Sequence, residues 1–121
     1  MTMQTGIILL AHGSRDPLWK LPIEAVAEAI RARDPQALVV CAYLELSSPE
    51  LSQAANELIE RGARRIRVFP LFFGVGKHAR EDLPRLFAEL GTAHPELALE
   101  LLPTAGEQSQ ITALIAAIAL A

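Results

Sequence analysis

Four short apolar runs alternate with segments of helical spacing along this chain, and this alternation limits the folds open to it. The runs are continuous in Ile, Val, Leu and Ala, which is typical of strands that are buried on both faces. We expect strands at residues 6–11, 37–44, 65–71 and 97–102. Apolar residues at helical spacing predict helices at residues 18–33, from about 50 to about 61, from a cap at or near Asp82 onward, and 107–121. A serine of the pair Ser47-Ser48 is expected to cap the second of these helices, with Pro49 early in it and Gly62 as its left-handed terminator.

Strands that alternate with helices form mainly parallel sheets, because parallel neighbours need a crossover connection. The sequence therefore predicts an α/β three-layer sandwich with a four-stranded, mainly parallel sheet and helices on both faces. The 121 residues suit one domain, and 51% hydrophobic residues are enough for a core. In such sheets ligands bind at the carboxyl ends of the strands, near the point where the strand order reverses.

Composition excludes several classes of function. The net charge of −3 and the absence of a Lys/Arg run argue against nucleic acid as a partner. The first residues show no export signal, which predicts a cytoplasmic protein, and the apolar segment 111–121 is too short to cross a membrane. Cys41 is the single cysteine, so a metal would be held by histidine and carboxylate side chains.

Three candidate ligands follow predicted strands. His12 follows the first strand, Glu45 follows the second, and His78 ends the loop after the third, so the fold can bring them to one edge. Imidazole binds Co, Ni, Fe and Zn, and it is a base near neutral pH. A structural hydrogen-bonding role is the alternative for each histidine, and helix capping is the alternative for Glu45. Two histidines in glycine-containing loops favour a functional pair.

Cationic and aromatic side chains surround these loops. Arg15, Lys77 and Arg80 are candidates for binding an anionic substrate, although ordinary surface charge is the alternative for each. One of the adjacent Phe72 and Phe73 is expected to enter the core, and the other, for which Phe73 is the candidate, to contact a flat ligand. The glycines of the loop before His78, Gly76 among them, allow a ligand to approach the backbone.

At three places the chain resembles the short-form sirohydrochlorin chelatases, a class II chelatase family often named CbiX or SirB. The matching segments are LAHGSRDP at residues 10–17, AYLEL at 42–46 with Pro49, and PLFFGVGKH at 70–78 with DLP at 82–84. They occur in the family's order and cover essentially the whole chain. The resemblance implies that His12 and His78 are catalytic metal ligands, that Glu45 assists as a third ligand, and that the fold is chelatase-like.

The family inserts Co²⁺ or Fe²⁺, and in some lineages Ni²⁺, into tetrapyrroles for cobalamin or sirohaem biosynthesis. The resemblance therefore implies a lyase whose metal ion is a substrate, with no tightly bound cofactor. Longer members contain two such units in tandem, so one unit per chain implies a homodimer. The apolar helix at 107–121 would then pack on a partner subunit, and packing on the chain's own sheet is the alternative.

Two other functions fit parts of the pattern. A carrier would bind the same tetrapyrrole or metal without turnover. A phosphoryl-transfer enzyme would use a phosphorylated His12, but enzymes of that type place an arginine just before the histidine, where this chain has Ala11. The chelatase hypothesis is therefore favoured over both.

Overall fold

β1 (Thr5–Ala11) is the central strand of the computed structural model, which describes residues 4–121. Residues 1–3 belong to the segment in which the sequence shows no export signal, and they lie outside the described residues. Ile8 of β1 pairs with Val40 of β2 (Leu38–Tyr43) on one side and with Val68 of β3 (Arg65–Pro70) on the other. Ile8, Leu9 and Leu10 are fully buried, which explains the continuous apolar run.

The sheet has four strands in the order β2-β1-β3-β4, where β4 is Ala98–Leu101, and every pair is parallel. The α/β class and the parallel sheet predicted from the sequence are therefore confirmed. The chain leaves β1 toward β2 on one side and later returns to β3 on the other side. The strand order thus reverses beside β1, and a ligand site is expected at the carboxyl ends of β1 and β3.

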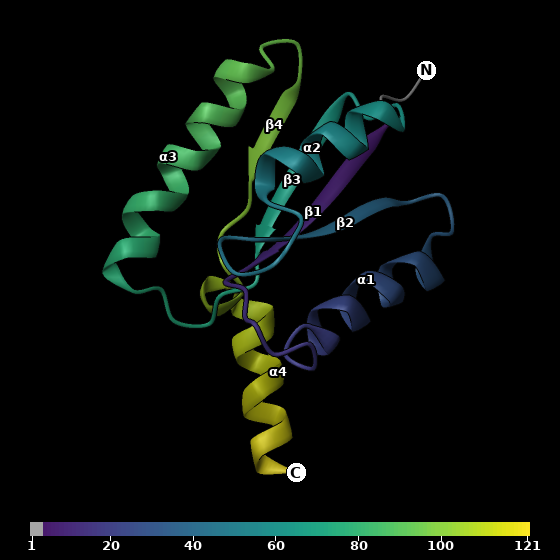
Figure 1. Ribbon diagram of the computed structural model, residues 1–121. Coiled ribbons are helices and arrows are strands. Elements are labelled where there is room, and N and C mark those ends of the chain that lie inside the picture. The colour runs from purple at the N-terminus through teal and green to yellow at the C-terminus, as the bar shows by residue number, and fades with distance from the viewer. Residues whose placement is uncertain (1–3) are drawn as a thin grey trace.

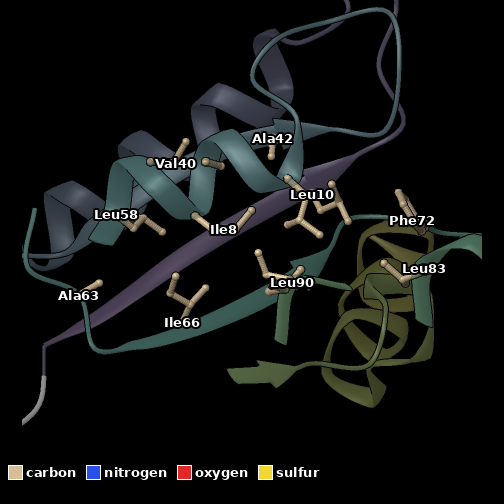
Figure 2. Close-up of a cluster of buried hydrophobic side chains, with 14 of the residues drawn as sticks. Ile8, Leu10, Val40, Ala42, Leu58, Ala63, Ile66, Phe72, Leu83 and Leu90 are labelled. Carbon is tan, nitrogen blue, oxygen red and sulfur yellow. The ribbon is translucent and has the colours of Figure 1, made fainter. Parts of the chain in front are cut away.

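Helices cover the two faces of the sheet unequally (Figure 1). α1 (Leu21–Arg33) packs on one face, where Ala27 contacts Leu9 and Val39. α2 (Leu51–Glu60) and α3 (Lys77–Ala93) cover the other face. Figure 2 shows the larger core on that face, in which Leu58 of α2 and Leu83 and Leu90 of α3 pack with side chains of the sheet and with Phe72.

The third helix begins earlier than the sequence predicted. α3 begins at Lys77 with Gly76 as its N-cap, so Asp82 lies inside the helix and does not cap it. Pro84 lies within α3, where a proline normally costs about 3 kcal/mol. The buried residues Ala79, Leu83 and Leu90 continue one apolar stripe past Pro84, and their packing maintains the helix. His78 consequently lies in the first turn of α3.

The start of α2 also differs from the prediction. The cap is Glu50, whose backbone N–H donates to Oε1 of Gln53 at 2.8 Å, and the helix begins at Leu51. The predicted serine cap is wrong, because Ser47 and Ser48 both lie before Glu50. The Ser47 hydroxyl instead donates to the carbonyl of Ser14 at 2.8 Å. The predicted left-handed terminator is confirmed, since Gly62 has a φ of 101°.

α4 (Ser109–Leu120) follows a short 3-10 turn, η1 (Ala105–Glu107), and projects away from the sheet (Figure 1). Among the described elements it packs mainly against η1. Leu114 is 60% exposed and Ile118 is 68% exposed, so packing of this helix on its own sheet, one of the two alternatives above, is not what the structure shows. No helix within residues 4–121 is long and apolar enough to cross a membrane.

Gly91, near the end of α3, offers a test of the packing between α3 and β4. A Cβ at this position would meet Cδ1 of Leu99 at 3.6 Å, which is an ordinary contact. Glycine in a helix costs about 0.5–1 kcal/mol relative to alanine, so we expect Gly91→Ala to raise the free energy of unfolding by about that amount. Urea denaturation followed by circular dichroism measures the change. A lower stability would mean that α3 and β4 lie too close to admit a methyl group.

Candidate active site

The loops that carry His12 and Glu45 lie side by side because the pairing of β1 with β2 continues beyond both strands. The backbone N–H of Leu44 donates to the carbonyl of Ala11 at 3.0 Å, and that of Glu45 donates to the carbonyl of His12 at 3.0 Å. These bonds fix two of the predicted site residues next to each other at the carboxyl edge of the sheet.

Gly13 and Ser47 hold the same two loops together. Gly13 has a φ of 105°, and a Cβ built there would lie 1.7 Å from the carbonyl oxygen of Glu45. The Ser47 hydroxyl donates to the carbonyl of Ser14 at 2.8 Å and accepts from the N–H of Ser14 at 3.3 Å. The His-Gly-Ser sequence therefore serves as a close junction between the first and second loops.

Leu46, the residue after Glu45, has a strained backbone. Its φ is 62°, and it is the one non-glycine residue with a positive φ among residues 4–121. A bulky residue in this region costs of order 1–2 kcal/mol, and such strain concentrates at functional sites. The side chain of Leu46 is 53% exposed, so its own burial does not offset this cost.

The imidazole of His12 stacks on Phe72, with ring centroids 4.2 Å apart and an angle of 24° between the planes. Phe72 is 1% exposed, whereas Phe73 is 73% exposed. This confirms that one of the two phenylalanines enters the core. The core-facing ring of Phe72 supports His12, a role that sequence reasoning missed because it depends on which side chain turns inward.

His12 and His78 line one cleft with a volume of about 530 Å³ between the strand edge and α3. Glu45, Gly76 and Lys77 line it as well, so five of the predicted site residues meet there. The other lining residues are Leu44, Ala79, Asp82, Arg85 and Leu86. The fold therefore brings the two histidines together from loops that are far apart in sequence.

Asp82 and Arg85 are cleft residues that sequence reasoning did not assign to the site. They lie four and seven positions after His78, which places them on the same face of α3. Arg85 donates to Oε1 of Glu89 at 3.0 Å and to Oδ1 of Asp82 at 3.5 Å. The hydrogen bonds that Arg85 donates to Glu89 and to Asp82 raise the pKa of its guanidinium, which stays charged. If the sequence had predicted a helix that begins at Lys77, His78, Asp82 and Arg85 would have been expected on one face of it.

Three predicted substrate-binding residues do not line the cleft. Arg15 is exposed in the loop after β1, and Phe73 is exposed in the loop after β3. Arg80 lines a different cavity of about 350 Å³ together with Leu83 and Thr104.

Among residues 4–121, no three His, Cys, Asp or Glu side chains are grouped so that they could already hold a metal ion.

The model of the CbiX family matches residues 6–119 of this sequence. The chain belongs to the CbiX family. This membership confirms the resemblance drawn from the three motifs. A protein of Saccharolobus solfataricus named sirohydrochlorin cobaltochelatase is 36% identical over 88% of this chain and 77% of its own length. The protein of the same name from Methanocaldococcus jannaschii is 36% identical over 74% of this chain, and the match spans 62% of that relative.

Solved structures show the same fold for this CbiX-family chain. A putative cobalamin biosynthesis CbiX protein from Marinobacter aquaeolei superposes with a TM-score of 0.81 at 31% identity, and the match covers 96% of this chain and 94% of that one. The sirohydrochlorin chelatase SirB from Bacillus subtilis, solved in complex with cobalt, has a TM-score of 0.79 at 23% identity. This chain covers 49% of that SirB chain, which is therefore about twice as long.

Proposed function

We propose that this CbiX-family chain is a cytoplasmic enzyme that inserts a divalent metal ion into sirohydrochlorin or a closely related tetrapyrrole. The observation that carries the proposal is the single cleft lined by His12 and His78. The names of the family's relatives support the reaction and the substrate. Co²⁺ and Fe²⁺ are the first candidates for the metal, with Ni²⁺ as a third.

The reaction exchanges one metal ion for two protons, and two imidazoles suit both halves of it. An imidazole nitrogen replaces water on the hydrated ion, and an imidazole that has released the ion accepts a pyrrole proton. Glu45, fixed beside His12, supplies an oxygen ligand or accepts a proton. In this proposal the metal is a substrate that passes through the site and not a resident cofactor.

Substrate binding falls first to the cleft residues. Lys77 provides a positive charge beside His78, and Gly76 leaves open space, since a Cβ there would meet nothing within 4 Å. We retain Arg15, Arg80 and Phe73 as contacts only for parts of the macrocycle that extend beyond the cleft. A carrier function would use the same surfaces, and only turnover separates it from catalysis.

The test is anaerobic metallation of sirohydrochlorin, followed by its absorbance change, with Co²⁺, Fe²⁺ and Ni²⁺ in parallel. We expect the protein to accelerate metallation above the uncatalysed rate for at least one of these ions, and the ratio of the rates gives the metal preference. Rates equal to background with all three ions would contradict the proposal.

We further propose that two copies associate through α4. Residues 109–121 contain no charged side chain, and Leu114 and Ile118, which share one side of the helix, are 60% and 68% exposed. An uncharged, exposed helix is unusual in a monomer and needs an apolar partner. A second copy supplies an identical helix in a two-fold interface, and the doubled length of SirB is in keeping with two units acting together.

A charge placed on the apolar side of α4 tests this association. We expect Ile118→Glu to convert the dimer to a monomer and to raise its dissociation constant at least about 100-fold, because burying an unpaired carboxylate costs several kcal/mol. The control is Ala113→Glu, which adds the same charge on the opposite side of the helix. Size-exclusion chromatography with light scattering measures the mass. A wild-type monomer, or a dimer that survives Ile118→Glu, would contradict the proposal.

A further inference from the structure

We propose that Arg85 binds a carboxylate at the periphery of the tetrapyrrole and so helps to hold the ring in the cleft of His12 and His78. The inference rests on the proposed function, because it takes a polycarboxylated macrocycle as the substrate. It assigns a substrate contact to a residue that neither the sequence motifs nor the strand ends indicated.

The position of Arg85 on α3 fits the shape of such a substrate. Arg85 lies seven positions after His78, which is about two helical turns and roughly 10 Å along the axis, and both residues line the same cleft. The metal enters the centre of the ring, whereas the carboxylates lie on side chains around its edge. A group that binds them must therefore lie away from the metal ligands, and Arg85 lies about two helical turns from His78.

The guanidinium is already held along the wall of the cleft. One terminal nitrogen donates to Glu89 at 3.0 Å and the other donates to Asp82 at 3.5 Å. These bonds use two of the five N–H donors of an arginine, and the side chain is still 56% exposed. The remaining donors are available to a further carboxylate, and the planar guanidinium suits its two oxygens.

The other cations near the site are placed differently. Among the residues that line the cleft, Lys77 adjoins His78 and therefore lies nearer the expected centre of the ring. Arg80, on the same helix, lines the separate cavity beside Thr104. Arg85 is thus the one guanidinium among the cleft residues, about two helical turns from His78 along α3.

Three variants test the inference: Arg85→Ala, Arg85→Lys and the control Arg61→Ala. Arg61, which follows the last residue of α2, forms a comparable exposed i,i+4 ion pair with Glu57 at 2.7 Å. Removing either exposed ion pair changes the free energy of unfolding little. We expect Arg85→Ala to raise KM for sirohydrochlorin, and the dissociation constant of the metal-free tetrapyrrole, about tenfold with kcat within about twofold. Arg85→Lys should fall between Arg85→Ala and wild type, and Arg61→Ala should match wild type.

The binding measurement separates this inference from the proposed function. A spectral titration with metal-free sirohydrochlorin requires no turnover, so weakened binding by Arg85→Ala supports the role of Arg85 even if the wild type fails to metallate. Equal affinity and equal KM for wild type, Arg85→Ala and Arg61→Ala would overturn the inference and leave the proposed function standing. A wild-type protein with no affinity for the tetrapyrrole would overturn both.

Discussion

His78→Ala and His12→Ala are each expected to lower the rate of metal insertion at least about 100-fold, close to the uncatalysed background. A positioned acid or base contributes about 10² to 10⁴ in rate, and each histidine is also a proposed metal ligand. His78 is exposed in the first turn of α3, and His12 is exposed with one face on Phe72. Both substitutions should therefore change the free energy of unfolding by no more than about 1 kcal/mol.

The matched control for these variants is His94→Ala. His94 is the remaining histidine of the chain, at the end of α3, and it lines a different cavity from the cleft of His12 and His78. We expect this variant to keep wild-type turnover. Initial rates of metallation, with thermal unfolding curves for each variant, measure both effects. A folded His12→Ala or His78→Ala protein with near wild-type turnover would refute the role of that histidine.

Gly13→Ala is expected to abolish metal insertion and to destabilise the protein by about 2–5 kcal/mol. The new methyl group would lie 1.7 Å from the carbonyl oxygen of Glu45, and the φ of 105° is unfavourable for alanine. The obstructing atom is backbone, so no side-chain rotation relieves the clash. The second loop must move away, and this separates Glu45 from His12.

Gly74→Ala is the control for the effect of Gly13, because a Cβ at Gly74 would meet nothing within 4 Å. We expect this variant to unfold at about the wild-type urea concentration. Urea denaturation and metallation rates measure both substitutions. If Gly13→Ala were as stable as Gly74→Ala and as active as the wild type, the close junction between the two loops would not be needed for the site.

The sequence was sufficient for the sheet but not for every helix. The apolar run of β1 correctly predicted a central strand, because a strand with parallel neighbours on both sides is buried on both faces. Ile8 and Leu10 are fully buried, as this position requires. The predicted start of α3 was wrong because Asp82 and Pro84 are typical of the first turn of a helix. In the structure the packing of Ala79 and Leu83 in the core stabilises a helix that begins before Asp82 and continues past Pro84. The orientation of α4 depends on what covers it, which local periodicity does not encode.

Part of the site could be predicted from the sequence, and part of it depends on where α3 begins. His12, Glu45 and His78 were predictable because strand ends of a parallel sheet meet at one edge, and the structure places all three in one cleft. Arg85 was missed because its side of α3 depends on where the helix begins. Arg80 was predicted to bind substrate because it follows His78 closely in sequence. Residues two positions apart on a helix lie on different faces, so Arg80 does not line the cleft of His78.

We propose that His12 and His78 pass a metal ion to a tetrapyrrole and are then free to bind another. The most direct measurement is the amount of metallated sirohydrochlorin formed per chain with both substrates in excess and the uncatalysed rate subtracted. We predict product that increases linearly with time well beyond one equivalent per chain. Product that stops at one equivalent would contradict catalysis and would identify the protein as a carrier.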